Sequence, residues 1–209
     1  LYMSTQFNGK WISDEQYKFT EKGISPKPLL FKKNLKFNKQ VKCVKVYSTA
    51  IGIYDFFLNG KKVGKNYFAP GFTSYRHQLQ YQMYDITDLV KDENDLYFLV
   101  AGGWAVGSFV FTRKNRDVAD RQAILCDIHV TYEDDSKEII STDETWDVTN
   151  SSPVLMADFY DGETYDANID IEKINYHKAS YEKLRINPKL LLDYGASVIA
   201  HETMLPISV

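Results

Sequence analysis

The sequence predicts an all-β fold in which two sheets pack face to face as a sandwich. Aromatic residues make up 14% of the chain, with fifteen Tyr and twelve Phe, and both residue types favour strands. Short strand-like runs recur from residue 41 onward, and turn signals separate most of them. Two of these runs are joined by Asn59-Gly60, which is typical of a tight hairpin turn because both central residues of that turn need positive φ.

The composition is that of an ordinary globular protein, with 44% hydrophobic and 25% charged residues among 209. The net charge of −3 argues against a nucleic-acid partner. No apolar stretch reaches the roughly 18 residues of a membrane span, and no signal-peptide pattern occurs at the start. We therefore expect no membrane partner and a cytoplasmic location.

The two cysteines, Cys43 and Cys126, both lie in strand-like runs. Two buried thiols in a reducing compartment are the favoured interpretation, and a single disulfide is the alternative. The histidines lie far apart and lack the spacing of zinc ligands, at His77, His129, His177 and His201.

Residues 1–40 predict an N-terminal arm that packs on the sandwich, with an edge strand at Leu29-Leu30-Phe31. The sandwich core is expected over 41–170. The run 95–101 is almost wholly apolar, so we expect it in the middle of a sheet. Asp is a common residue at the start of a helix, so we expect Asp85 to cap a short helical turn. The expected strands lie near 41–48, 52–58, 78–84, 95–101, 122–132, 137–142 and 145–149.

Residues 171–209 are expected to return to the sandwich and begin the connection to a further domain. The hydrophobic periodicity weakens from 171 to 192, which predicts loop or short helix. Residues 197–203 predict a last strand.

The densest polar cluster lies at 158–167. On a strand, Asp161 and Glu163 would share a face about 7 Å apart, which is a possible acid and base pair for glycoside hydrolysis. Together with Asp166 they are also candidate calcium ligands, and no other cofactor is expected. The leading interpretation is structural: these acids hydrogen-bond loop backbone or dock another domain.

Trp104 follows two glycines at the end of the most apolar run. Its ring suits either stacking on a sugar or closing one end of the core. Tyr75, with Tyr81 and Tyr84, predicts a polar and aromatic strand surface that suits sugars or another domain.

Successive blocks resemble the N-terminal domain of bacterial α-L-rhamnosidases, glycoside hydrolases of family 78. They include Leu58-Asn59-Gly60-Lys61-Lys62-Val63-Gly64, Ala69-Pro70-Gly71-Phe72-Thr73-Ser74-Tyr75 and Tyr160-Asp161-Gly162-Glu163-Thr164-Tyr165-Asp166-Ala167. The resemblance implies a jelly-roll sandwich of the galactose-binding type. It also implies that an (α/α)₆ barrel outside this chain carries the catalytic acids that cleave terminal α-L-rhamnose, so no catalytic residue is expected here.

Some domains of this type bind rhamnose with a bridging calcium ion. Many members have an acidic residue after Val-Gly, whereas this chain has Lys65-Asn66, and Phe72 stands where tryptophan is common. An ammonium group repels calcium, so we expect weak or absent calcium-dependent binding. The candidate carbohydrate-binding residues are Trp104, Tyr75, Asn66, Asp161 and Glu163.

The favoured hypothesis is a non-catalytic accessory domain of an α-L-rhamnosidase, with the catalytic and other β-domains of the same polypeptide as partners. The rival is an autonomous module that binds L-rhamnose-containing glycosides. A third hypothesis is a complete small enzyme that uses Asp161 and Glu163. A large exposed apolar patch would favour docking, and an open groove lined by Trp104 or Tyr75 would favour the module.

Overall fold

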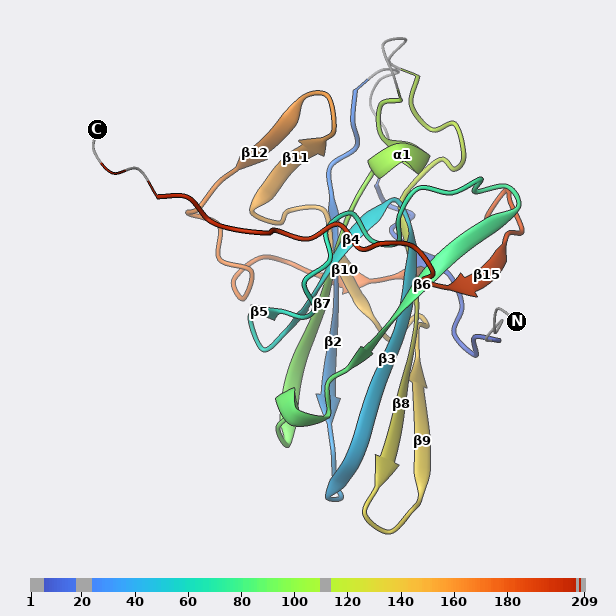
Figure 1. Ribbon diagram of the computed structural model, residues 1–209, viewed down its shortest axis with the longest axis vertical. Helices are drawn as coiled ribbons and strands as arrows, with labels where there is room; N and C mark the ends of the chain where they lie inside the picture. Colours follow the sequence, from blue (N-terminus) through green and yellow to red (C-terminus); the bar gives the residue numbers. More distant parts are fainter. Residues whose placement is uncertain (1–5, 18–23, 110–113, 206, 208–209) are drawn as a thin grey trace.

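The computed structural model describes residues 6–17, 24–109, 114–205 and 207. Two sheets lie face to face, and a separate hairpin stands at one end of them (Figure 1). The prediction of an all-β sandwich is confirmed. The strands are β1 (Ile12–Ser13), β2 (Leu29–Lys36), β3 (Val41–Ile51), β4 (Ile53–Leu58), β5 (Lys61–Lys62), β6 (Gln78–Asp85), β7 (Glu93–Ala101), β8 (Ala123–Tyr132), β9 (Lys137–Ser141), β10 (Asp147–Thr149), β11 (Val154–Asp158), β12 (Gly162–Tyr165), β13 (His177–Lys178), β14 (Ser180–Tyr181) and β15 (Lys189–Leu192).

The first sheet has seven strands in the order β14-β1-β8-β3-β6-β15, with β9 also paired to β8. The second sheet has six strands in the order β13-β10-β2-β7-β4-β5. Strand β15 runs parallel to β6, whereas the long pairs β3–β8 and β2–β7 are antiparallel. All the strands expected between residues 41 and 149 are present, with small shifts at their ends.

The core lies between the two sheets and is rich in aromatic rings. Phe98 on β7 stacks on Phe56 of β4 with ring centroids 4.9 Å apart, and on Trp146 at 6.1 Å. All three side chains are fully buried, and burying an aromatic ring of this size is a major part of core stability. Strand β7 lies between β2 and β4, which confirms the prediction that the apolar run is internal.

The hairpin turn between β4 and β5 has the predicted geometry, since φ is 50° at Asn59 and 76° at Gly60. The side chain of Asn59 fixes this turn to β7, because its Oδ1 accepts a hydrogen bond from the backbone N–H of Asp95 at 3.0 Å. The short helical turn expected after Asp85 is the 3₁₀ helix η1 (Thr87–Leu89). Oδ1 of Asp85 accepts hydrogen bonds from the Thr87 backbone N–H and hydroxyl.

Three predictions about local structure are wrong. Leu29–Phe31 is not on an edge strand, because β10 pairs with β2 on the side away from β7. Residues 171–192 hold three strands, of which β13 pairs in one sheet and β14 in the other. Residues 197–203 form no strand, and the single bridge in this region joins Tyr67 to Val198.

The division into an arm, a core and a returning segment stays a prediction; the described part of residues 1–40 supplies β1 to one sheet and β2 to the other. Cys126 is buried, Cys43 is half-buried, and both are free thiols rather than a disulfide. Burial raises the pKa of the Cys126 thiol. The described helices are too short to cross a membrane.

Candidate functional site

Five aromatic rings form a continuous row near one end of the sandwich, which we call the aromatic ridge: Tyr67, Phe68, Phe72, Trp104 and Phe159. Trp104 lies on the short helix α1 (Gly103–Val106) and stacks on Phe159, with ring centroids 4.2 Å apart and ring planes inclined by 23°. Phe68 meets Phe159 at 5.2 Å, and Phe72 meets Trp104 at 5.5 Å. Tyr67, Phe68 and Phe72 are 46%, 41% and 58% exposed, so the row lies at the surface.

The loop 66–72 carries three of these rings and is held to the body by its backbone. The carbonyl of Ala69 accepts a hydrogen bond from the Tyr54 N–H at 2.7 Å, and the Gly71 N–H donates to the Phe68 carbonyl at 2.9 Å. Gly71 has φ of 97°, a conformation that glycine adopts without strain. The loop therefore presents its aromatic side chains from a fixed backbone.

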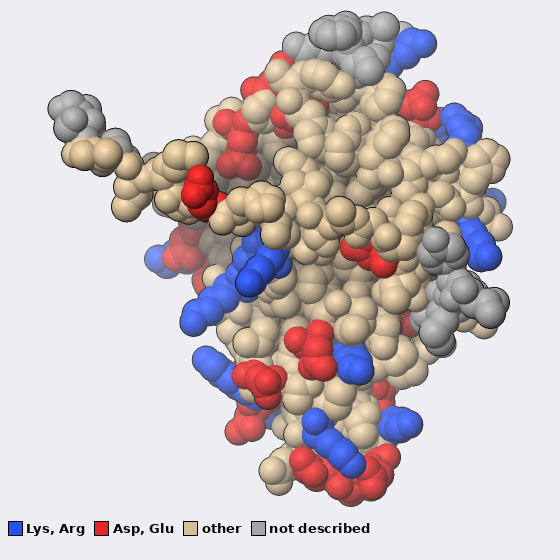
Figure 2. All heavy atoms as spheres, viewed as in Figure 1, with Lys and Arg blue, Asp and Glu red and all other residues tan. Residues whose placement is uncertain are grey.

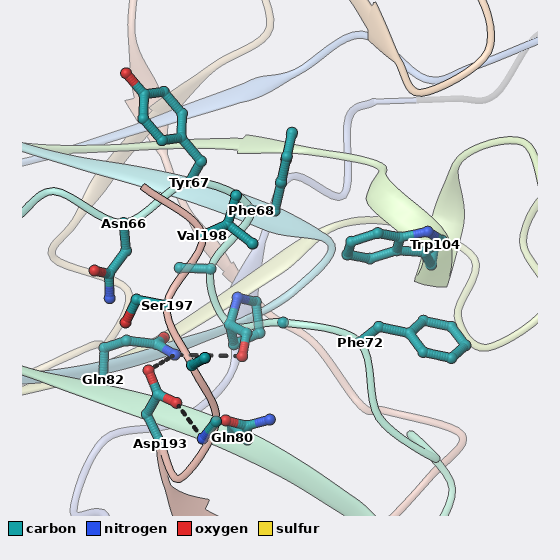
Figure 3. Close-up of a pocket in the computed structure, with 15 residues that line it drawn as sticks. Asn66, Tyr67, Phe68, Phe72, Gln80, Gln82, Trp104, Asp193, Ser197 and Val198 are labelled. Carbon is teal, nitrogen blue, oxygen red and sulfur yellow. Dashed lines mark hydrogen bonds between the residues drawn. The ribbon is translucent and has the colours of Figure 1, made fainter. Parts of the chain in front are cut away.

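A hollow of about 330 Å³ opens beside the ridge (Figure 3). Its apolar side is formed by Phe68, Phe72 and Trp104, and its polar side by amide and carboxylate groups. Gln82 donates from Nε2 to the Pro70 carbonyl at 3.3 Å and to Oδ2 of Asp193 at 3.4 Å. The hollow is lined by residues 66–72, Gln80, Gln82, Trp104, Asp193 and residues 195–198.

A network of buried hydroxyl groups holds the side chain of Gln82 in place. The Tyr54 hydroxyl donates to Oε1 of Gln82 at 2.8 Å and lies 2.9 Å from the Ser48 hydroxyl and 3.2 Å from that of Tyr84. Burial raises the pKa of Tyr84 to about 12, and burial also raises the pKa of Tyr54 well above its ordinary value. Both phenols therefore stay protonated at neutral pH and act as hydrogen-bonding groups rather than bases.

The far wall of the hollow comes from the end of the described chain, which crosses in front of β6 (Figure 1). The Asp193 N–H donates to the Tyr81 carbonyl at 2.9 Å, and the Tyr67 N–H donates to the Val198 carbonyl at 2.8 Å. Between these two points the segment is exposed. The hollow is therefore shaped by residues distant in sequence.

The structure brings together some of the sequence-predicted site residues and separates others. Trp104 and Asn66 line the same hollow. Tyr75 does not, because its side chain is only 5% exposed and its hydroxyl donates to the Gly71 carbonyl. The prediction of an exposed aromatic surface at Tyr75 and Tyr81 is wrong, since Tyr81 is also buried. Trp104 also packs against a minor core cluster, as its alternative interpretation predicted.

The acidic candidates lie elsewhere, on the hairpin β11–β12. Asp161 is in its turn, Glu163 is on β12, and both are exposed. Asp166 follows β12, and its Oδ1 accepts hydrogen bonds from the backbone and side chain of Asn168. In the part of the chain that the structure describes, no three His, Cys, Asp or Glu side chains are grouped to hold a metal ion.

Sequence reasoning missed Gln80, Gln82 and Asp193. A signal for the glutamines was present, since Gln78, Gln80 and Gln82 alternate with other residues and so share one face of β6. Two of these glutamines are nevertheless buried, which the sequence does not reveal. No sequence pattern links Asp193 to them, because their meeting depends on the path of the returning chain.

The fold and the hollow define the class of protein: an all-β sandwich of two sheets with an aromatic and polar hollow near one end. The chain belongs to the α-L-rhamnosidase N-terminal domain family, whose model matches residues 39–209. An α-L-rhamnosidase of Formosa agariphila is 31% identical over 176 residues, which are 82% of this chain and 19% of that protein.

Solved structures agree with this assignment. The structure of Streptomyces avermitilis α-L-rhamnosidase complexed with L-rhamnose matches with a TM-score of 0.70 and 30% identity, over 79% of this chain and 17% of that one. The α-L-rhamnosidase structure from Dictyoglumus thermophilum has a TM-score of 0.84 at 24% identity, covering 97% of this chain and 24% of that one, and shows the shared fold. This chain therefore spans less than a quarter of each of these relatives.

Proposed function

We propose that this chain is a non-catalytic accessory domain of a longer α-L-rhamnosidase, whose catalytic (α/α)₆ barrel lies outside it and hydrolyses terminal α-L-rhamnose from glycosides. Its role is to pack against the other domains of that polypeptide. The observation that carries this proposal is the aromatic ridge, in which three large rings are 41–58% exposed on one continuous surface. Contiguous exposed apolar patches of this kind usually mark an interaction surface.

The length of the relatives supports the choice of partner. This segment corresponds to 19% of the Formosa protein and 17% of the Streptomyces chain, so a full-length relative contains several times more polypeptide. Aromatic residues are enriched at the centres of protein interfaces, where their large rings bury much apolar area. The other domains of the same polypeptide are therefore the partner that we assign to the ridge.

The test compares ridge variants in the full-length enzyme and in the isolated chain. Phe72→Ser and Phe68→Ser should lower the unfolding temperature of the full-length enzyme much more than that of the isolated chain. Leu89→Ser is the matched control, because Leu89 is 51% exposed on η1 away from the ridge. Equal effects in both contexts would contradict docking through the ridge.

A second candidate function is binding of L-rhamnose-containing glycosides in the hollow. It is favoured by the placement of Asn66, Gln82 and Asp193 beside Trp104, since sugar sites combine aromatic rings with fixed polar groups. One face of Trp104 is already covered by Phe159, which leaves less of the ring for a sugar. Lys65 is exposed next to Asn66, so we expect no calcium requirement.

Calorimetric titration of this chain with L-rhamnose, first with calcium and then with chelator, tests the second candidate. Binding that Asn66→Ala abolishes, and that the exposed control Asn38→Ala leaves intact, would establish the hollow as a sugar site. Absence of heat in both conditions would remove this candidate and leave docking.

A further inference from the structure

Residues 177–182, which we call the strap, join the two sheets along one side of the sandwich. Strand β13 at the start of the strap pairs with β10 of the six-stranded sheet, and β14 near its end pairs with β1 of the seven-stranded sheet. Between them, Ala179 is buried in the main core, and its N–H donates to the Trp146 carbonyl at 2.9 Å. The Glu182 N–H donates to the Trp11 carbonyl at 2.9 Å. The strap therefore closes this side of the core.

One ion pair links the strap to the chain that follows β1. Nε2 of His177, on β13, lies 2.8 Å from Oδ1 of Asp14, the residue directly after β1. The side chain of Asp14 is only 1% exposed, whereas that of His177 is 32% exposed. The imidazole can therefore exchange protons with water, while the carboxylate is shielded from it. Because β13 and β1 belong to different sheets, this pair connects the two layers.

The carboxylate of Asp14 has few other donors. Its Oδ1 also accepts a hydrogen bond from the Gln16 N–H at 2.9 Å, but its Oδ2 is buried and has no hydrogen-bond partner among the described residues. Asp127 is equally buried, and its two oxygens accept hydrogen bonds from the N–H groups of Asn8 and Gly9 at 2.7 and 2.9 Å. Figure 2 shows other acidic side chains that lie at the surface of one face, where water solvates them. Asp14 therefore depends on a charged partner more than these acids do.

The charged groups beside this ion pair are engaged elsewhere. On β10, Asp147 pairs with the ammonium of Lys178 at 2.6 Å. Nε of Arg121 lies 3.3 Å from Glu182, and its Nη1 donates to the backbone carbonyl of Asp14 at 2.9 Å rather than to the carboxylate. In the part of the chain that the structure describes, the imidazole of the strap is thus the cationic group that pairs with this carboxylate.

We propose that Asp14 and His177 form a proton-dependent latch, which holds the strap closed in mild acid and weakens as the pH rises. A protonated imidazole donates a charge-assisted hydrogen bond to the carboxylate, and such a bond is stronger than one from a neutral ring. Histidine is the side chain that ordinarily changes charge between about pH 5 and pH 8. The ion pair exists only while His177 is protonated, so its contribution to closure is present in mild acid and lost at higher pH. The latch lies outside the aromatic ridge and the hollow beside it, so it depends on neither proposed function.

Glu182 at the end of the strap titrates in the same direction and has to be separated from the latch. Burial raises the pKa of the Glu182 carboxyl above its ordinary value of 4.5, and the nearby charge of Arg121 only partly offsets this effect. A carboxyl group with a raised native pKa also loses its contribution to stability as the pH rises. Glu182→Gln removes this second contribution and leaves the latch in place.

Amide hydrogen exchange tests the latch, because the protection factor of an amide reports how often its segment opens. In the parent chain, protection of the Ala179 and Glu182 N–H groups should fall about tenfold from about pH 5.5 to about pH 8. This is the difference expected between a charge-assisted and a neutral hydrogen bond. In His177→Gln, which keeps a donor without the charge, and in Asp14→Asn, protection should be the same at both pH values. Glu182→Gln should keep the fall at Ala179.

Two controls make the result specific. His129→Gln is the matched variant, because the His129 ring stacks on Tyr47 at 4.8 Å away from the strap, and it should keep the full pH response. The Tyr132 N–H donates to the Ser136 carbonyl at 2.9 Å in the turn between β8 and β9, and its protection should stay constant. Circular dichroism of each variant confirms that it is folded. The proposal is overturned if strap protection in the parent chain does not change with pH, if Tyr132 loses protection equally, or if His177→Gln responds as the parent chain does.

Discussion

The ring of Trp104 stacks on the ring of Phe159 at 4.2 Å, and this contact joins helix α1 to the turn of the hairpin β11–β12. Phe159 also meets Phe68 from the loop before β6, so one ring connects three segments that are far apart in sequence. The aromatic ridge and the hairpin β11–β12 therefore share a structural support at Phe159.

Replacing Phe159 with alanine should free the hairpin turn. We expect a loss of about 1–2 kcal/mol in the free energy of unfolding, from the aromatic contacts and the area they bury. Protease cleavage between β11 and β12 should become faster. Urea unfolding and limited proteolysis measure these effects. Ile139→Ala on β9 is a control, since Ile139 is 45% exposed, and equal effects of the two changes would refute the role given to Phe159.

Asp158 should make folding sensitive to acid. Burial pushes the pKa of Asp158 up, but hydrogen bonds donated by Ser25, Tyr160 and Ser108 outweigh it and hold the pKa below the ordinary value of 3.8. A carboxyl group with a lowered native pKa stabilises the fold above its unfolded pKa, and this contribution is lost as pH falls through the native value. The free energy of unfolding of Asp158→Asn should therefore change less with pH below 3.8 than that of the parent chain.

The exposed acid Asp88 provides the comparison for this pH effect. The free energy of unfolding of Asp88→Asn, measured in urea, should equal that of the parent chain at each pH throughout the acid range. If the value for Asp158→Asn also equals that of the parent chain, the hydrogen bonds at the tip of the hairpin β11–β12 contribute nothing to acid stability.

Removing the Tyr54 hydroxyl should destabilise the sandwich beside the hollow. Tyr54→Phe leaves Oε1 of Gln82 without its buried donor, and an unsatisfied buried acceptor costs about 1–3 kcal/mol. Chemical denaturation measures the loss. Tyr165→Phe, at a position 61% exposed, should change stability little. A Tyr54→Phe variant as stable as the parent would mean that water replaces the lost hydroxyl.

Gly60→Ala tests the hairpin turn between β4 and β5. A Cβ at Gly60 meets nothing within 4 Å, so any cost comes from its φ of 76°. We expect a loss of about 1 kcal/mol in the free energy of unfolding. Gly195→Ala is matched, because a Cβ there also meets nothing and no positive φ is required. If the two changes have equal effects, the turn conformation does not carry the cost.

The sequence predicts well those features that depend on local chemistry. Asn59-Gly60 predicts its turn because few other residues tolerate positive φ at both positions. The apolar run 95–101 predicts a central strand because both of its faces avoid water. The acids near 158–167 were expected to hydrogen-bond loop backbone, and Asp158 and Asp166 do so.

Features set by distant partners were not predicted. Strands β13 and β14 have two residues each, and they exist only because β10 and β1 lie beside them. Residues 197–203 look like a strand, yet after Val198 the described chain runs along no sheet edge. The sequence also does not predict that Trp104 and Asp193 line one hollow, because only the returning chain brings them together. Burial of Tyr75 likewise follows from packing against Phe72 and the minor core cluster.

The most direct test of the proposed docking role uses a calorimeter to mix this chain with the remainder of the longer α-L-rhamnosidase that we propose contains it, expressed without this domain. We expect saturable one-to-one binding that Phe72→Ser weakens at least about tenfold, because Phe72 is an exposed aromatic anchor, and that Leu89→Ser leaves unchanged. No binding at any concentration, or equal binding by all three forms, would contradict the assignment of the aromatic ridge as the docking surface.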